Sequence, residues 1–337
     1  MATIHDVALQ AGVSPTTVSR YLNRRIELPA ATAERIDAAI AALDYRPNVL
    51  AQRLSTGKSF AIGLVAPEIR EPFFAEIASA VEDEADRHGY TVFISSTRSD
   101  RARELASLQR LVDRQVDGLL LMTNIPDDGA LADMISRRRN VVVMDEDVPG
   151  ASAPRLFVEN REGMALATRH LIDHGHRRIA YLGGPEGLFS VTERREGFRL
   201  AMAEAGITLP PGYMVFGSFA PAHARLATLG LLDLAEPPTA IVASSDYLAM
   251  GAILALRDRG IVVPEDMSLI AFDDAAFGAL ITPPLTAIRQ PVELIGRRGF
   301  QLLLDLLEGR EPPALTRLPV DLIRRQSVGA PRRKDLK

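Results

Sequence analysis

Residues 3–23 read TIHDVALQAGVSPTTVSRYLN, and this stretch carries the start and stop signals of two short helices. Thr3 is a favourable N-cap for a first helix over residues 4–11, and Asp6 lies in its first turn, where the helix dipole favours an acid. Gly12 can take the positive φ angle that ends a helix. The opening of the chain therefore predicts a short helix followed by a glycine turn.

A second helix is predicted over residues 15–23, because Ser14 can cap it and Pro15 suits its first position. A third helix is predicted over residues 30–43, directly after Leu28-Pro29. Two short helices joined by a glycine turn form the helix-turn-helix pattern. On spacing alone, a plain three-helix bundle with a solvated polar face is the alternative.

The second helix has the side chains that a DNA-reading helix needs. In a helix-turn-helix motif this helix enters the major groove, and its N-terminal residues meet the base edges. Arg can pair bidentately with guanine, and Thr can offer a hydroxyl or a methyl group. The polar face of the helix carries Thr16, Thr17, Ser19 and Arg20. These residue types predict sequence-specific contact with double-stranded DNA.

Charge is distributed unevenly along the 337 residues, although the net charge is only −4. Residues 1–58 carry seven Lys or Arg against five Asp or Glu, so the head has a surplus of two positive charges and the remainder a net charge of −6. A basic head on an acidic body suits local binding of phosphates. The length predicts two or three domains. Cys is absent, which excludes disulfides and thiolate metal sites.

The N-terminal residues MATIHDVALQ have no basic start followed by an apolar run, so we expect no signal peptide. No apolar stretch approaches the length of a membrane span. The sequence therefore predicts a cytoplasmic protein without a membrane partner.

Residues 3–23 resemble the head of the LacI (lactose-repressor, or LacI/GalR) family of bacterial regulators, whose pattern T-I-x-D-V-A-x-x-A-G-V-S-x-x-T-V-S-x-x-L-N is matched throughout. Residues 43–48, LDYRPN, match the family's link after the third helix, and the resemblance continues over nearly the whole chain. It implies an all-α DNA-binding head at residues 1–46. The DNA contacts that we expect are Thr3, Ser14, Pro15, Thr16, Thr17, Ser19, Arg20, Asn23, Asn48, Ala51 and Leu54.

Residues 47–58, PNVLAQRLSTGK, follow the head and are too few to form a stable helix in water. On composition alone, an unstructured linker is the alternative. The resemblance implies a hinge that becomes helical only on operator DNA, where the leucine at the place of Leu54 enters the minor groove from each subunit of a dimer. Apolar wedges of this kind kink the duplex. The spacing from Ala51 to Leu54 matches the family.

From residue 59 onward, short apolar runs alternate with helical stretches, which is typical of parallel sheets covered on both faces. Strands are predicted at 61–65, 91–95, 118–122, 141–144, 179–182, 240–243 and 269–272. Helices are predicted at 73–88, 102–115, 163–174, 192–205, 222–234 and 247–259. These are too many strands for one ordinary sheet, so we expect two doubly wound lobes.

The resemblance implies that this α/β core, residues 59–330, has the two-lobed fold of periplasmic sugar-binding proteins, with a charged tail at 331–337. The first lobe is expected to comprise residues 59–159 and 291–321, and the second residues 161–289 and 323–330. The chain would then cross between lobes near 159–161, 289–291 and 321–324. Residues 59–69 (SFAIGLVAPEI) also resemble residues 177–187 (RRIAYLGGPEG), as if each lobe opened with the same strand.

No enzyme motif is present in the core. Residues 183–187 are glycine-rich but lack G-x-G-x-x-G spacing, and there is no P-loop and no G-x-S-x-G elbow. His170 and His174 lie one helical turn apart, but a polar helix end with Gly175 as its cap explains them better than a metal site does. We therefore expect no enzymatic activity, no cofactor and no metal.

Ligands of two-lobed folds bind at the carboxyl ends of the strands, in the crevice between the lobes. The residues that follow the predicted strands are aromatic, acidic, amide-bearing or Arg, a set that suits a sugar, because Phe can stack on its apolar face while Asp and Arg pair with its hydroxyls. The candidate effector contacts are Glu71, Phe73, Phe74, Asp145, Ser190, Arg194, Phe219, Ser245, Asp273 and Gln290. The resemblance implies this role for all of them except Glu71 and Ser245. Singly, such residues are often helix caps or core, so the prediction depends on their convergence.

Three positions depart from the family patterns. Glu71 stands where sugar-binding relatives often carry Asn. Glu146 stands where purine-binding relatives carry Trp and ribose-binding relatives Arg. Leu188 takes the place of an Arg of the purine regulator. These departures disfavour a purine and leave the identity of the sugar open.

The sequence thus predicts a repressor that binds a palindromic operator as a homodimer and is switched, by induction or corepression, by a small sugar such as a monosaccharide. Residues 331–337 lack leucine heptads, so no tetramerising coiled coil is expected. A regulator with a non-sugar corepressor is one alternative. A transport-type sugar-binding protein is another, opposed by the missing signal peptide and the DNA-binding head.

Overall fold

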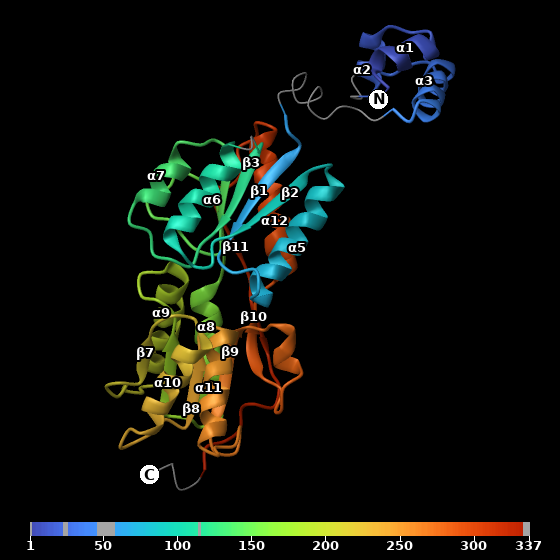
Figure 1. The fold of residues 1–337 in the computed structure, drawn as a ribbon. Coiled ribbons are helices and arrows are strands. Elements are labelled where there is room, and N and C mark those ends of the chain that lie inside the picture. The colour runs from blue at the N-terminus through green and yellow to red at the C-terminus, as the bar shows by residue number, and fades with distance from the viewer. Residues whose placement is uncertain (1, 23–25, 46–57, 114–115, 333–337) are drawn as a thin grey trace. The chain divides into compact units, whose positions relative to one another are not determined.

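The computed structural model describes residues 2–22, 26–45, 58–113 and 116–332. The chain divides into two compact units, Met1–Ser59 and Phe60–Lys337, which are described here separately. The first unit, the head, contains three helices, α1 (Ile4–Ala11), α2 (Pro15–Leu22) and α3 (Ala30–Ala42) (Figure 1).

The predicted helix signals in the head are confirmed. Thr3 caps α1 in a capping box, in which its hydroxyl accepts from the Asp6 N–H and the Asp6 carboxylate accepts from the Thr3 N–H. Gly12 ends α1 with a φ of 66°, in the left-handed region. The hydroxyl of Ser14 accepts from the Thr17 N–H at the start of α2. Side chains from all three helices, among them Val7, Val18 and Ile36, form a buried core.

The second unit, the core, contains two six-stranded sheets, one in each lobe. The strand order is β11-β5-β4-β3-β1-β2 in the first lobe and β12-β10-β9-β8-β6-β7 in the second. The first sheet comprises β1 (Ala61–Ala66), β2 (Thr91–Ser96), β3 (Gly118–Met122), β4 (Val141–Met144), β5 (Arg155–Val158) and β11 (Leu315–Leu318). The second comprises β6 (Ile179–Gly183), β7 (Met214–Phe216), β8 (Ala240–Ala243), β9 (Ser268–Asp273), β10 (Thr286–Arg289) and β12 (Asp321–Ile323).

The two sheets repeat the same order, with β1 corresponding to β6, β3 to β8 and β4 to β9. This correspondence explains the internal similarity in the sequence, because residues 59–69 and 177–187 contain β1 and β6. All pairs are parallel except β10 with β12, which is antiparallel, so the second sheet is mixed where an all-parallel sheet was expected.

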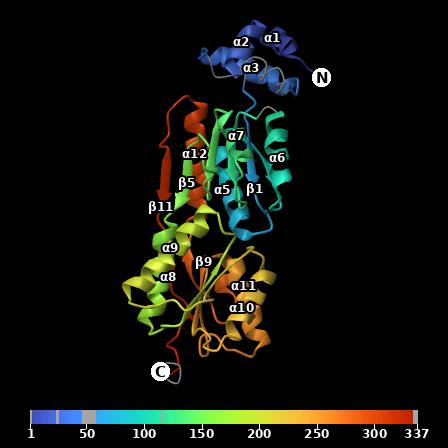
Figure 2. The same ribbon diagram turned by 90° about the vertical axis from the view of Figure 1, so that its left-hand side faces the viewer.

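Helices cover both faces of each sheet, as the alternation of apolar runs predicted (Figures 1 and 2). In the first lobe, α5 (Pro72–Arg87) and α12 (Val292–Leu307) pack on one face, and α6 (Arg101–Asp113) and α7 (Ala130–Ser136) on the other. In the second lobe, α8 (Asn160–Asp173) and α9 (Phe189–Glu204) oppose α10 (Pro221–Leu232) and α11 (Asp246–Asp258). A short 3₁₀ helix, Ala276–Ala279, follows β9.

The chain passes between the lobes three times. It leaves the first lobe between β5 and α8, returns between β10 and α12, and crosses again between β11 and β12. The third crossing, expected at residues 321–324, lies at residues 319–320, because Asp321–Ile323 already pairs with β10 in the second lobe. The short strands β5, β7, β10, β11 and β12 and the helices α7 and α12 were not among the predicted elements. Within the part of the chain that the structure describes, no helix is both long and apolar enough to cross a membrane.

Candidate functional site

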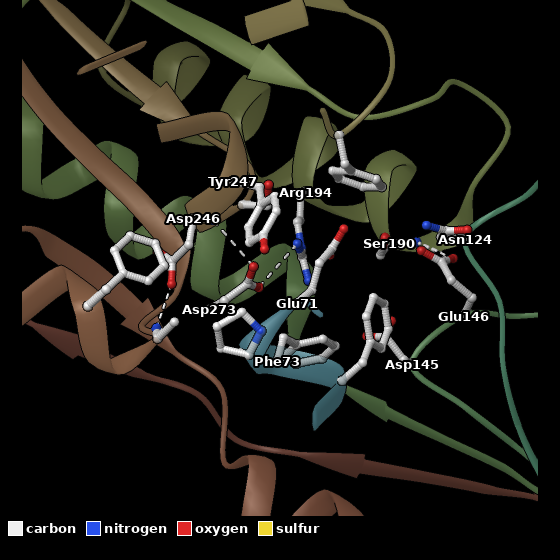
Figure 3. A pocket seen from close by; sticks show the side chains of 16 residues that line it. Glu71, Phe73, Asn124, Asp145, Glu146, Ser190, Arg194, Asp246, Tyr247 and Asp273 are labelled. Carbon is white, nitrogen blue, oxygen red and sulfur yellow. Dashed lines mark hydrogen bonds and ion pairs between the residues drawn. The ribbon is translucent and has the colours of Figure 1, made fainter. Parts of the chain in front are cut away.

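A cavity lies between the two lobes of the core, at the carboxyl ends of the parallel strands. Its lining comes from the strand ends, loops and first helical turns at and after β1, β3 and β4 in the first lobe and β6, β7, β8 and β9 in the second. Figure 3 shows the side chains of both lobes pointing into this space. The lining residues are Glu71, Pro72, Phe73, Phe74, Asn124, Asp145, Glu146, Ser190, Arg194, Phe219, Ser245, Asp246, Tyr247, Asp273, Ala275 and Phe277.

Arg194 on α9 is the positive charge of this cavity, and it is held on several sides. Its Nε donates to Oδ1 of Asn160 at 2.8 Å, and its Nη1 donates to the carbonyl oxygen of Ser244 at 2.6 Å. The guanidinium lies 3.8 Å from the centre of the Phe272 ring, in a cation–π contact. Nη2 has no protein partner in the described part of the chain, so it can donate to a ligand.

Asp273, at the end of β9, is equally constrained. Its Oδ1 accepts from Nε2 of Gln290 at 2.8 Å and lies 3.8 Å from Nη1 of Arg194, and its Oδ2 accepts from the Asp246 N–H at 3.4 Å. Burial raises its pKa, and the charge of Arg194 opposes that rise. Gln290 is buried and does not line the cavity, so the structure places it behind Asp273 as a support.

Asp145 occupies in the first lobe the place that Asp273 has in the second, since it directly follows β4 and β4 corresponds to β9. Both residues have left-handed φ angles, 71° for Asp145 and 106° for Asp273. Such angles are costly for residues with a side chain and are concentrated at functional sites. The side chain of Asp145 accepts no hydrogen bond from the described residues. Burial raises its pKa to about 7, although the charge of Arg194 acts in the opposite direction.

Glu146 joins the two lobes. Its carboxylate accepts from both the N–H and the hydroxyl of Ser190, the second residue of α9. The side chain is buried, and burial together with the charge of Asp145 raises its pKa to about 8. This contact between a β4 loop and a helix of the other lobe holds one end of the cavity together.

Glu71 precedes α5 at the other side of the cavity, where Figure 3 shows it between Asp273 and Asp145. Its carboxylate accepts no hydrogen bond from the described residues. Burial and the negative charge of Asp273 raise its pKa to about 7. Phe73 and Phe74, which follow it, contact each other edge to face with 5.1 Å between ring centres and give the cavity an apolar wall.

The structure therefore brings nine of the ten predicted effector contacts to one cavity, and Gln290 is the exception. The other residues of the lining were not selected as contacts: Pro72, Asn124, Glu146, Asp246, Tyr247, Ala275 and Phe277. Asp246 could have been found, because it is adjacent to the selected Ser245, which follows β8 by two residues. Asn124 follows β3 by the same distance and could have been found by the same rule, whereas Phe277 lies in the 3₁₀ helix after β9.

The predicted DNA contacts in the head differ in how far their side chains are exposed to solvent. Thr3, Ser14, Thr16 and Arg20 are exposed, while Pro15, Thr17 and Ser19 are half-buried. The hydroxyls of Ser14 and Thr17 lie 2.8 Å apart in a hydrogen bond. Asn23, Asn48, Ala51 and Leu54, with most of the predicted hinge at 47–58, lie outside the described residues.

His170 and His174 have structural roles in the second lobe. Their rings contact each other with 4.4 Å between centres, and Nδ1 of His174 lies 2.7 Å from the carbonyl oxygen of His170. Gly175, with a φ of 94°, follows the cap of α8. Among the residues that the structure describes, no three His, Asp or Glu side chains are grouped to hold a metal ion.

Comparisons with known proteins agree with this architecture. Residues 3–48 match the family described as bacterial regulatory proteins, lacI family, and residues 168–328 match a periplasmic binding protein-like domain. The chain is 36% identical over 334 residues to the HTH-type transcriptional repressor PurR of Haemophilus influenzae (strain PittEE), covering 97% of this chain and 99% of that protein.

Two solved structures are similar over nearly the whole chain. The lac repressor dimer bound to operator and the anti-inducer ONPF has a TM-score of 0.84 and 29% identity, covering 98% of this chain and 99% of that one. The transcriptional regulator CelR in complex with cellobiose has a TM-score of 0.74 and 31% identity, covering 97% and 100%. The chain therefore belongs to the lacI family of bacterial regulatory proteins and is a DNA-binding transcriptional repressor.

Proposed function

We propose that this repressor binds a palindromic operator as a homodimer and that a small sugar, bound in the cavity between the lobes, switches its affinity for DNA. The observation that carries the proposal is the composition of the cavity. Its polar side chains come from both lobes, with Asp145 and Glu71 from the first and Arg194 and Asp273 from the second. A ligand that pairs with both sets is bound only when the lobes are close together.

The exposed side chains of α2 support operator binding. Thr16 and Arg20 are exposed one helical turn apart, as base contacts from a recognition helix require. The hydrogen bond from Tyr21 to the Asp37 carboxylate, at 2.9 Å, ties α2 to α3 and fixes its orientation within the head. A rigid recognition helix keeps its contacts in register with the bases.

Two observations support a dimer, which the proposed palindromic site would require because of its two-fold symmetry. The similar lac repressor structure is a dimer bound to operator. Leu226 on α10 and Met250 and Leu254 on the adjacent α11 are large apolar side chains with exposed fractions of 66%, 36% and 43%, which a second copy of the chain would cover.

The chemistry of the cavity supports a sugar. Phe73, Phe74 and Phe219 offer apolar faces for a ring, and carboxylates with a guanidinium can pair with its hydroxyls. The similar CelR structure contains cellobiose. A ligand shifts the equilibrium between two arrangements of the lobes only by its differential affinity for them, which is typically about 1–3 kcal/mol.

Two measurements test the proposal. An operator is first selected from random duplexes, and its affinity is measured by fluorescence anisotropy with and without each of a panel of monosaccharides. We expect a palindromic operator, and at least one sugar that changes its affinity about 5–150-fold. If no sugar changes the affinity while a non-sugar metabolite does, the sugar assignment is wrong.

Arg20→Ala tests the recognition helix with the same assay. Because an Arg that pairs with a base edge carries about 1–3 kcal/mol of discrimination, the variant should lose its preference at one position of each half-site. Equal weakening on every sequence would show that Arg20 contacts only phosphate.

A further inference from the structure

The cavity between the lobes contains far more negative than positive groups. Five carboxyl side chains line it, those of Glu71, Asp145, Glu146, Asp246 and Asp273. Arg194 is the one Lys or Arg among the described residues of the lining. Even with Asp273 paired to Arg194, the other four carboxyl groups of the lining form no ion pair with a Lys or Arg of the described residues.

Other residues of the protein donate hydrogen bonds to only some of these five carboxyl groups. Asp273 accepts from Gln290 and Asp246, and Glu146 accepts from Ser190. Glu71 and Asp145 accept no side-chain hydrogen bond from the described residues. Asp246 is 2% exposed, and its Oδ1 has no partner although it is buried. Oδ1 of Asp246 is therefore a buried acceptor without a donor, which is costly, and the half-buried carboxylates of Glu71 and Asp145 add further acceptors, so the cavity favours a ligand that donates hydrogen bonds.

The walls of the cavity favour the same kind of ligand. Phe73, Phe74, Phe219, Tyr247 and Phe277 all line it. The faces of aromatic rings attract cations, and this attraction grows when water is excluded. Carboxylates surrounded by aromatic rings form a typical environment for an organic cation, whereas a phosphate or carboxylate ligand would meet like charges at short range.

We propose that the effector is a polyhydroxylated compound that carries a protonated amine, such as an amino sugar, and that Glu71 and Asp145 hold its ammonium group. The inference rests on the proposed function, since it names the chemical class of the ligand for the same cavity. An ammonium group offers three donors and no acceptor, which matches the unpaired carboxylates of the first lobe. Arg194 and Asp273 then hold the hydroxyls on the side of the second lobe.

The electrostatics agree with this geometry. Burial and the negative charge of Asp273 raise the pKa of Glu71 and of Asp145 to about 7, although the charge of Arg70 on Glu71 and that of Arg194 on Asp145 act in the opposite direction. A bound ammonium would stabilise both charged forms, so that the ligand and the two carboxylates form charge-assisted hydrogen bonds, which are about twice as strong as neutral ones.

Matched ligands test the proposal on the full-length wild-type protein. The probes are D-glucosamine, D-galactosamine and D-mannosamine, each compared with its parent hexose and its N-acetyl derivative by calorimetry and thermal shift. We expect at least one amine to bind about tenfold or more tightly than both neutral partners, because the ring is the same and only the charge differs. The proposal is overturned if the neutral partners bind as tightly in every set, or if no amine binds.

A pair of variants on the same element tests the role of Glu71. Glu71→Gln removes one charge from the cavity, and Glu76→Gln removes one from an exposed position of α5 that does not line the cavity. Glu71→Gln should abolish most of the preference for the amine, and Glu76→Gln should retain it. Equal loss in both variants, or retention in Glu71→Gln, overturns the assignment. If Glu71→Gln does not fold, Asp145→Asn takes its place.

Failure of the inference and failure of the proposed function are distinguishable in the operator assay. An amine that binds but leaves operator affinity unchanged supports the ligand class and contradicts the switch. A neutral sugar that binds more tightly than its amine and changes operator affinity supports the switch and overturns the ligand class.

Discussion

The two lobes of the core have the same strand order, yet the halves of the cavity that they supply are organised differently. In the second lobe, Arg194 and Asp273 are fixed by Asn160, Ser244 and Gln290 before any ligand arrives. In the first lobe, Asp145 stands at the corresponding strand end and accepts no hydrogen bond from the described residues. The repeated strand order thus places Asp145 and Asp273 at corresponding positions. The neighbouring side chains fix Asp273 before a ligand binds, whereas Asp145 has no such partners among the residues that the structure describes.

This difference suggests an order of events. A preorganised half loses little conformational entropy on binding, so it makes the stronger initial contacts. The unpaired acceptors of the first lobe gain partners only when that lobe approaches the bound ligand. The ligand would then bind to the second lobe first, and the first lobe would move toward it afterwards.

The largest expected effect comes from removing the cation of the preorganised half. Arg194→Ala removes the cation beside the Asp273 carboxylate and the donor to the buried amide oxygen of Asn160, so the free energy of unfolding of the core should fall by about 3–5 kcal/mol. Urea denaturation measures this change. The control is Arg195→Ala, the next residue of α9, whose partner Glu186 is 65% exposed, and it should cost less than about 1 kcal/mol. Equal losses would show that the two halves are not organised differently.

The next largest effect is expected from removing the carboxylate of Asp273, which also belongs to the second lobe. Asp273→Ala should weaken effector binding by about 1.5–3 kcal/mol, the contribution of a hydrogen bond to a charged group, while operator affinity without effector stays unchanged. Operator titrations with and without effector measure both quantities. Asp258→Ala, which removes an exposed carboxylate from α11, serves as the control. An unaltered effector response in Asp273→Ala would contradict the assigned cavity.

The smallest effect is a pH dependence that comes from the carboxyl groups of the cavity, because burial raises their pKa values in both lobes. The pKa of Glu146 is raised to about 8 and those of Glu71 and Asp145 to about 7. A carboxyl with a higher pKa in the folded chain binds more protons there than in the unfolded chain, so raising the pH favours unfolding. Burial lowers the pKa of His170 to about 4 and also lowers that of His176, so near pH 6.5 the unfolded chain binds more protons at these residues, and this opposing contribution fades as the pH rises toward 8.

The stability of the core should therefore fall as pH rises from 6.5 to 8. Each of these carboxyl groups contributes at most about 1.4 kcal/mol per pH unit. Melting temperatures measured across this interval check the trend. Glu146→Gln keeps an acceptor for Ser190 but cannot ionise, so its slope should be shallower. A wild-type melting temperature that rises with pH would contradict the raised pKa values.

Much of the fold could be predicted from the sequence, and the failures have a physical pattern. Central strands such as β3 and β8 are buried runs of apolar residues, and their bounds were predicted as they are observed. β7 and β12 have only three residues each and are half-buried or exposed, so they lack that signal. β12 pairs with β10 although more than 30 residues separate them in the chain, and local pattern contains no information about such pairing.

The candidate site was predicted to a similar extent. Residues directly after strands, such as Asp145 and Asp273, converge because parallel strands end at one edge. Gln290 obeys the same rule but points behind Asp273, since the rule gives position along the chain and not the direction of the side chain. Tyr247 was missed because its role depends on the other lobe, where its hydroxyl donates to the Arg70 carbonyl at 3.4 Å.

The triple crossing of the chain also has a consequence for synthesis on the ribosome. The apolar interior of the first lobe includes Phe300, Leu302 and Leu303 of α12 together with Ile62 and Leu64 of β1, and its edge strand β11 ends only at Leu318. The head has an interior of its own, which is complete by residue 45. The nascent chain can therefore fold its head early, while the first lobe must wait, with apolar strands already emerged, until Leu318 has been translated. Truncations near the C-terminus should for that reason damage the lobe that begins the core.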